Sequence, residues 1–243
     1  MPYSKGNKDC YLCSQIKGDA DHDLIAKMLP DYPYRRRVIL ENDSFAVIPS
    51  LGALTEGHVL LCPKTHVHSF AQLGRQSDKD VSARYLQIKN SLIKILEHHY
   101  GAPIFLFEHG MSANGGHTPC SIDHAHLHFI PMTAPIKLDG LSADFIQVKL
   151  TSLKSLAEAS HEQEYLLCEF PDGTSHIATG LTSSFPSQGL RRLFAESLGN
   201  KDRWNWRNSP HPEIADSIWQ KLVNTTNRDH DRVSAAAVDL KTH

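Results

Sequence analysis

The segment His-Ala-His-Leu-His-Phe-Ile occupies residues 124–130 and is followed by Pro131. Successive side chains of a β-strand point to opposite faces, so this alternation predicts a strand with His124, His126 and His128 on one face. Packing explains such a row poorly, because each imidazole carries polar nitrogen atoms that need partners. Neutral imidazole both binds zinc and attacks electrophiles, so the pattern indicates a metal site, a nucleophilic site at phosphorus, or both.

A second motif, Cys-Tyr-Leu-Cys, occupies residues 10–13. This spacing lets two thiolates bind one tetrahedral zinc ion. A redox pair is expected in a strand-to-helix unit of thioredoxin type, which is missing around Cys10 and Cys13, and a disulfide is disfavoured in the cytosol. An unrelated pair of surface cysteines is the remaining alternative.

The row of histidines resembles the signature of the histidine-triad (HIT) superfamily, nucleotide hydrolases and transferases that include the galactose-1-phosphate uridylyltransferase branch. Residues 57–66, Gly-His-Val-Leu-Leu-Cys-Pro-Lys-Thr-His, are similar to a second segment of that superfamily. The two segments, in matching order and separation, cover roughly residues 40–132. The resemblance implies an α+β fold, with a HIT-like antiparallel sheet, a covering helix and a further α+β extension at the C-terminus.

The resemblance also implies roles for individual residues. His126 is the expected nucleophile toward the α-phosphorus of a nucleotide, and His128 is expected to donate to a phosphate or bridging oxygen. Zinc-containing members complete their site with the histidine of the upstream segment and the first histidine of the triad. Carried over to this sequence, the implied ligands of a structural zinc are Cys10, Cys13, His66 and His124, with His68 as the rival to His66.

Members of the superfamily commonly bind the α-phosphate with a glutamine, and Cys120 aligns at that position. Phosphate contact is therefore expected from Ser121, from loop amides, or from His109 and His117, because glycines in this loop let the backbone approach phosphate. From the C-terminal half, Arg191 and Arg192 are expected to bind leaving-group phosphate, with a surface ion pair as the equal alternative.

The periodicity of the first half predicts strands near residues 37–40, 45–49, 57–62 and 103–107. One amphipathic helix is expected to begin with a capping box at Ser77 and to end at Gly101. We expect a zinc-containing catalytic domain over residues 1–138. The extension over 139–243 is expected to pack on it and to take the place of the second subunit of the usual dimer.

The second half predicts a hairpin from residues 164–170 and 175–179, a helix that opens at Phe185 and ends at Gly199, and another from Pro212 to about Val223. Residues 141–161 suit either a helix or a strand. This half also resembles, more loosely, the C-terminal region of CwfJ-like proteins, which are associated with RNA processing. That similarity keeps open a scaffold without catalysis, although CwfJ-like members often lack a complete triad.

The bulk properties indicate a cytoplasmic enzyme of 243 residues, 40% hydrophobic, with neither a membrane-spanning run nor an apolar N-terminal segment. Five cysteines, an odd number, argue against a disulfide framework. A net charge of -2 makes nucleic acid an unlikely partner, and the short run at residues 35–37 is either a solvated edge or an anion site. The expected partner is a nucleotide or nucleotide-conjugate substrate, and the expected state is a monomer or homodimer.

The activity that the resemblance implies is hydrolysis at the α-phosphate of a nucleotide joined to a second group by a phosphoanhydride or phosphoramidate bond, through a nucleotidyl-histidine intermediate. A nucleotidyltransferase or phosphorylase is the alternative. Hydrolysis is favoured because His128 stands where the uridylyltransferase branch uses glutamine. The local motifs do not specify the base, the sugar or the leaving group.

Overall fold

The computed structural model describes residues 10–112 and 122–239, and side chains as far as residue 225. Three residues singled out in the sequence, His117, Cys120 and Ser121, lie outside the described residues. The α+β fold with an antiparallel sheet, expected from the resemblance, is confirmed. None of the described helices combines the length and apolarity needed to cross a membrane.

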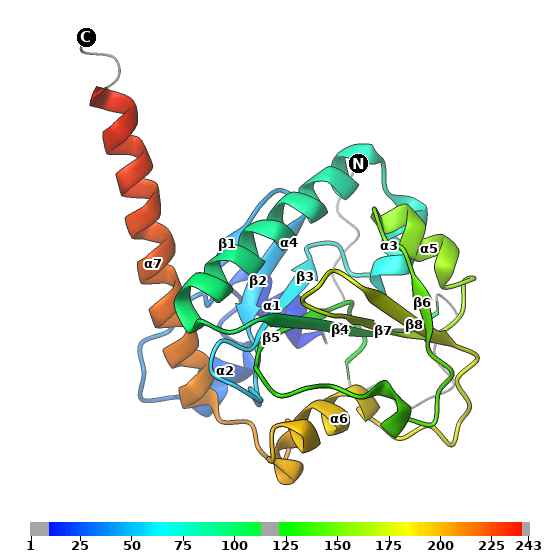
Figure 1. Ribbon diagram of the computed structural model, residues 1–243. Coiled ribbons are helices and arrows are strands. Elements are labelled where there is room, and N and C mark those ends of the chain that lie inside the picture. Colours follow the sequence, from blue (N-terminus) through cyan, green and yellow to red (C-terminus); the bar gives the residue numbers. More distant parts are fainter. Residues whose placement is uncertain (1–9, 113–121, 240–243) are drawn as a thin grey trace.

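One antiparallel sheet contains all eight strands of the described residues, in the order β1-β2-β3-β5-β4-β7-β8-β6 (Figure 1). The strands are β1 (Leu40–Glu41), β2 (Phe45–Pro49), β3 (Val59–Pro63), β4 (Ile104–Gly110), β5 (Leu127–Pro131), β6 (Ile146–Val148), β7 (Tyr165–Glu169) and β8 (Ser175–Thr179). Strand β7 pairs directly with β4, so both halves of the chain contribute to the same sheet. The division at residue 138 into two domains stays a prediction.

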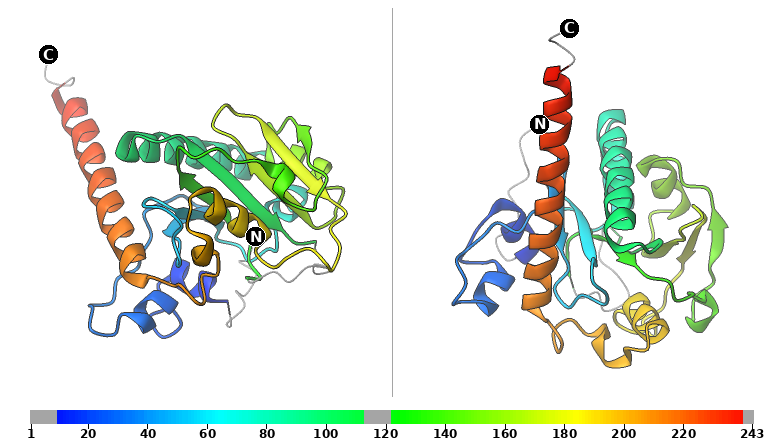
Figure 2. Two further views of the ribbon diagram at one scale, coloured as in Figure 1. Left: turned by 60° about the horizontal axis from the view of Figure 1, so that its bottom comes forward. Right: turned by 60° about the vertical axis from the view of Figure 1, so that its left-hand side comes forward.

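The helices lie on both faces and at one edge of this sheet (Figures 1 and 2). The α-helices are α1 (Tyr11–Lys17), α2 (Leu24–Met28), α3 (Phe70–Gln76), α4 (Lys79–Tyr100), α5 (Leu153–Ala159), α6 (Gly189–Ser197) and α7 (Pro212–Asp239). The described residues also form two 3-10 helices: η1 (Leu138–Gly140) lies between β5 and β6, and η2 (Lys201–Trp204) lies between α6 and α7. Residues 141–161 contain both a strand, β6, and a helix, α5, which explains why the sequence suited either.

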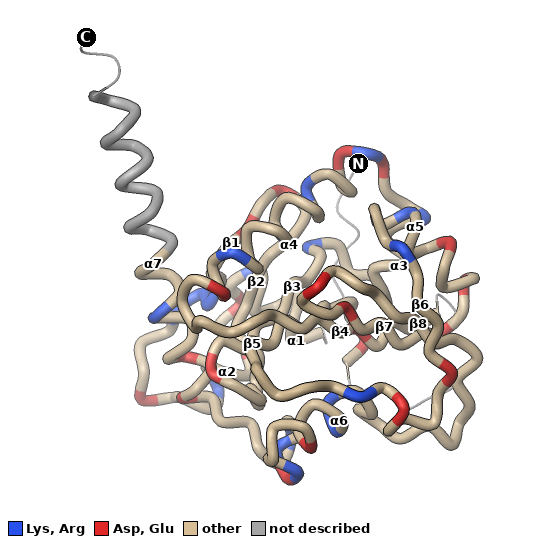
Figure 3. The backbone as a smooth tube through the Cα atoms, viewed as in Figure 1, with Lys and Arg blue, Asp and Glu red and all other residues tan. Residues whose placement is uncertain are grey.

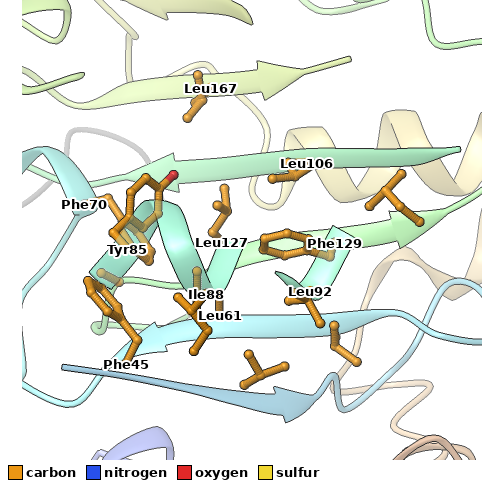
Figure 4. Packing of buried hydrophobic residues seen from close by; sticks show 14 of the residues in the cluster. Phe45, Leu61, Phe70, Tyr85, Ile88, Leu92, Leu106, Leu127, Phe129 and Leu167 are labelled. Carbon is orange, nitrogen blue, oxygen red and sulfur yellow. The ribbon is translucent and has the colours of Figure 1, made fainter. Parts of the chain in front are cut away.

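Helix α4 covers one face of the sheet, as its apolar periodicity predicts. Tyr85, Ile88 and Leu92 pack on side chains of the central strands, including Leu127 and Phe129 (Figure 4). Complete burial of one such apolar side chain stabilises the fold by about 1.5–3 kcal/mol. The expected capping box at Ser77 is wrong by one residue.

The side chain that caps α4 belongs to Asp78, which accepts from the backbone N–H of Val81 at 3.0 Å. Its carboxylate satisfies one of the N–H groups that the first helical turn leaves without a partner. Gly101 ends the helix in the left-handed conformation, as expected.

The opposite face of the sheet is covered by α1 at one end and α6 at the other. Leu12 and Ile16 of α1 pack on β2 and β3. Phe194 of α6 packs on Phe105 and Phe107 of β4. The start of β5, with the histidine row, therefore lies on the face between two helices, one from each half of the chain.

The expectation for the histidine strand is partly wrong. Strand β5 begins at Leu127, so only His128 is inside the strand, whereas His124 and His126 precede it. Residue 128 pairs with Leu60 of β3 and Phe107 of β4, which anchors this end of the row to the sheet. The earlier residues are held by side-chain contacts and by the bond from Ala125 N–H to the Val67 carbonyl, at 2.7 Å.

Residues 35–37 agree with the expected solvated edge at Arg35 and Arg36, which are exposed, but not at Arg37. Arg37 is buried, and its guanidinium donates to Asp216 of α7 at 2.7 Å. Arg36 binds Glu41 instead. Elsewhere in this view, acidic and basic residues are mixed over much of the chain (Figure 3).

Candidate active site and metal site

A cleft lies between the end of the histidine row and the first turn of α6. We call it the histidine cleft, and its lining residues are Phe107, His109, His126, His128, Gln188, Gly189, Leu190 and Arg191. The sheet supplies one wall with three imidazoles, and α6 supplies the other wall with a guanidinium. His126, His128, His109 and Arg191, all singled out in the sequence, therefore lie together.

The ring of His126 is oriented by the backbone of the preceding histidine. Its Nδ1 atom lies 2.7 Å from the carbonyl oxygen of His124. Because a carbonyl only accepts, Nδ1 carries the proton and the lone pair of the neutral ring is on Nε2. Burial is the main reason that the pKa of His126 falls to about 4, so the ring is neutral near pH 7.

His128 belongs to a chain of three groups. The backbone N–H of Leu54 donates to Nδ1 of His58 at 3.0 Å, and Nε2 of His58 lies 2.8 Å from Nδ1 of His128. Since Nδ1 of His58 accepts, its Nε2 carries the proton and donates to His128. His128 therefore carries its own proton on Nε2.

Both rings of this pair are neutral, because burial holds the pKa of His58 and of His128 well below the usual 6.5. The ring of Phe107 stacks on His128 at 4.1 Å between ring centroids. The sequence showed His58 within the Gly-His segment, but no role followed from the pattern. Its contact with His128 joins positions 70 residues apart, which local spacing does not reveal.

Arg191 is 5% exposed and donates to two backbone carbonyls, those of Gly52 at 2.6 Å and Trp204 at 2.8 Å. Among the described residues, no carboxylate forms an ion pair with it. Burial lowers its pKa to about 10, which still leaves it charged near pH 7. The cleft therefore contains one positive charge whose protein partners are neutral oxygen atoms.

Arg192 does not line the cleft. Its guanidinium lies 3.3 Å from the centre of the Trp204 ring, and its Nε donates to the carbonyl of Ser187 at 2.9 Å. Adjacent residues of a helix point about 100° apart, so two neighbouring arginines cannot both face the same cleft.

Gln188 was missed in the sequence. It precedes α6 with a positive φ of 56°, and its buried Oε1 atom has no hydrogen-bond partner in the described part of the chain. Backbone strain of this kind in a residue other than glycine costs of order 1–3 kcal/mol and often accompanies a binding site.

The cysteine motif and two histidines form a separate cluster beside the cleft. Ligand atoms of Cys10, Cys13, His66 and His124 all lie within 4.8 Å of one another. Nδ1 of His124 lies 3.4 Å from Sγ of Cys10 and 3.4 Å from Sγ of Cys13. Nδ1 of His66 lies 3.4 Å from Sγ of Cys13. The neighbouring Cys13 thiol, more than His124, holds the pKa of Cys10 down at about 3, which favours a thiolate in the cluster.

The hydrogen bonds around the cluster suit a metal. Nε2 of His124 donates to the carbonyl of Pro63 at 2.9 Å, which leaves the lone pair of Nδ1 directed at the two sulfur atoms. His68, the rival ligand, binds the carboxylate of Asp123 instead. Two sulfur and two nitrogen donors are a set that tetrahedral zinc accepts.

Residues 25–142 match the family model described as "Scavenger mRNA decapping enzyme C-term binding". The matched segment contains the histidine row and the Gly-His segment on neighbouring strands. On this match and this motif, residues 25–142 form a segment of the histidine-triad superfamily. The match ends at residue 142, so the likeness of the second half to CwfJ-like proteins stays a prediction.

Several solved structures are similar to part of the chain. They include a Streptococcus mutans protein (SMU.412c; 19% identity, 56% of this chain, 73% of that chain, TM-score 0.38) and a HIT-family protein from Bacillus subtilis (18%, 51%, 73%, 0.36). A zinc-bound histidine-triad protein from Mycobacterium smegmatis is 19% identical over 51% of this chain and 75% of its own, with a TM-score of 0.35. No curated protein matches the sequence.

Proposed function

We propose that this protein hydrolyses a nucleotide conjugate at its α-phosphate, with His126 as the nucleophile. One observation carries the proposal: the carbonyl of His124 fixes the proton of His126 on Nδ1, at 2.7 Å. The lone pair on Nε2 is then available without a base, because the ring is already neutral. The cleft around it also holds the charge of Arg191.

In the first step, Nε2 of His126 forms a bond to the α-phosphorus, and the bond from phosphorus to the leaving oxygen breaks. The Nε2–H of His128 donates to an oxygen on which negative charge develops. His58 supports this role by occupying the other nitrogen of His128, at 2.8 Å. In the second step, water releases the nucleoside monophosphate and restores His126.

Phosphate binding is assigned to Arg191, with His109 beside it in the cleft. A guanidinium without a carboxylate partner attracts an anion, and in a site screened from water this attraction is stronger than at a surface. Ser121 and His117 remain candidates from the sequence alone. For Arg192 we propose an indirect role, because it packs on Trp204 next to the cleft.

A structural zinc ion is proposed for the cluster of Cys10, Cys13, His66 and His124. Its four donors leave no open position, so the metal would tie α1 to the segment before β5 and supply no chemistry to the reaction. The cluster lies next to the nucleophile, because His124 provides both a ring to the cluster and a carbonyl to His126.

The proposal is tested with dinucleoside polyphosphates, nucleotide sugars and nucleoside phosphoramidates, each with and without inorganic phosphate. Release of a nucleoside monophosphate with water as the only acceptor is the expected result. Turnover that requires phosphate or a sugar phosphate would instead establish a transferase. An absence of turnover, together with tight and salt-sensitive RNA binding, would favour a scaffold.

A further inference from the structure

The third histidine in the cleft, His109, is bound to a buried carboxylate from the other half of the chain. Nε2 of His109, on β4, lies 2.8 Å from Oε1 of Glu164, which directly precedes β7. Glu164 is only 4% exposed. A carboxylate so far from water is retained at a cost, unless it serves a charged or hydrogen-bonding partner.

His109 lies in the same cleft as the nucleophile, because both His109 and His126 line it. Phe107 is opposite His128 in the antiparallel pair of β4 and β5. His109 follows Phe107 by two residues on β4, so the two side chains point to the same face of the sheet.

The second half of the proposed reaction needs a base, and the two histidines of the row that line the cleft, His126 and His128, cannot serve. His126 is then bound to phosphorus through Nε2. His128 accepts from His58 on Nδ1 and carries a proton on Nε2, so neither of its nitrogens can take a proton from water. Among the described residues that line the cleft, His109 is the remaining imidazole.

We propose that His109 is the general base of the second step and that Glu164 is its positioning residue, an inference that rests on the proposed function. The carboxylate of Glu164 accepts a hydrogen bond from Nε2–H of His109, so Nδ1 is the atom that takes up a proton. Water attacks the phosphorus, its proton passes to Nδ1 of His109, and the bond from phosphorus to Nε2 of His126 breaks. The electron pair returns to His126, and Glu164 balances the imidazolium formed at His109.

The test separates the two steps with the 5′-p-nitrophenyl esters of AMP and UMP. In His109→Asn, release of p-nitrophenol should begin with a burst that matches the enzyme concentration and has a rate near that of the wild type. The steady rate that follows should fall by a factor on the order of 10² or more, the usual contribution of a general base. Nucleotidyl protein should accumulate and be seen by mass spectrometry after alkaline quenching.

Glu164→Gln provides a second variant, since it keeps an acceptor oxygen and removes the charge. It should show the same burst and a smaller loss in the steady rate. The dependence of the burst rate on substrate concentration should be unchanged. His161→Asn, an exposed histidine of the same segment, is the matched control and should behave as the wild type. Melting temperatures and zinc content show which variants are folded.

If His109→Asn and Glu164→Gln both fail to fold, the wild-type protein is measured in D2O. Hydrolysis of the intermediate should then be slower than in H2O, while the burst is unchanged. The base is excluded if folded His109→Asn slows burst and steady rate equally, if it slows neither, or if D2O leaves hydrolysis unchanged. A wild-type protein that releases p-nitrophenol without ever forming an adduct contradicts the proposed function instead.

Discussion

The carbonyl oxygen of His124 lies 2.7 Å from Nδ1 of His126, while the ring of His124 faces the two cysteines of the metal cluster. One residue thus joins the cluster to the nucleophile. The position of the His124 backbone depends on its ring, and the ring is held by the cluster on one side and the Pro63 carbonyl on the other. We therefore expect the metal to affect catalysis through orientation rather than through chemistry.

Cys13→Ser should remove zinc and lower the melting temperature together, because a bound structural metal contributes directly to folding stability. Purified wild-type protein should hold about one zinc ion per chain for the four ligands of a single site. His68→Asn is the control, since that ring binds Asp123. Metal analysis measures the zinc content, and thermal melting measures the stability. A metal-free wild type with the same melting temperature as Cys13→Ser would refute the site.

His58→Phe should lower kcat more than it changes KM. The variant retains an aromatic ring but cannot donate to Nδ1 of His128, so the proton of His128 is no longer fixed on Nε2. A loss of about 10- to 100-fold is expected for a group that acts through hydrogen-bond orientation. Steady-state kinetics at pH 7.5 on the best substrate of the panel measure it, and an unchanged kcat would mean that this pair is structural only.

Arg191→Lys should weaken substrate binding, because one ammonium cannot keep both backbone carbonyls and still face a phosphate. We expect KM to rise by about tenfold or more, the scale of one charge-assisted hydrogen bond. Arg192→Lys, one position further along the same helix, is the matched comparison and should raise KM by less, because that side chain packs on Trp204 and does not line the cleft. Equal effects of the two substitutions would place the phosphate elsewhere.

The buried carboxyl of Glu108 should make stability depend on pH. Burial raises its pKa from 4.5 to about 7, so the folded protein binds a proton that the unfolded chain has already lost. The free energy of unfolding should therefore fall as pH rises from about 4.5 to 7, by about 3 kcal/mol for this group. Above pH 7 the contribution becomes constant.

Glu108→Gln isolates this effect, since Gln retains an acceptor for the N–H of Phe70, at 2.9 Å in the wild type. Urea unfolding of both proteins at pH 5, 6, 7 and 8 gives the difference in their stability, in which contributions from other titrating groups cancel. As pH rises, the free energy of unfolding of Glu108→Gln should increase relative to that of the wild type. A difference that is independent of pH would show that Glu108 titrates at its ordinary pKa.

The sequence predicted the central part of the fold because its signals are local. The helix ending at Gly101 and the hairpin at residues 164–179 follow from periodicity and turn residues, and both are present. The helix α3 was missed, since it is a short element whose buried positions, such as Phe70 and Leu73, depend on tertiary contacts. Helix α7 also begins at Pro212 as expected but continues past Val223 to Asp239.

The site was predictable where a motif was compact. Cys10 with Cys13, and His126 with His128, come from compact motifs, whereas the full set of four metal ligands was expected only from the resemblance; the structure brings the members of each set together. Partners separated along the chain left no signal: His58 contacts His128 across 70 positions, and His109 contacts Glu164 across 55. Gln188 was hidden for another reason, because its backbone conformation is not encoded by residue type.

The covalent intermediate at His126 tests the account most directly. The wild-type protein is mixed with its best substrate, quenched under mildly alkaline conditions that spare phosphohistidine, and digested. We expect the mass of one nucleoside monophosphate on the peptide that contains His126, and none in His126→Gly, whose turnover should fall by several orders of magnitude while zinc content and melting are nearly unchanged. Near-normal turnover by His126→Gly, or a nucleotide attached to a different residue, would contradict the account.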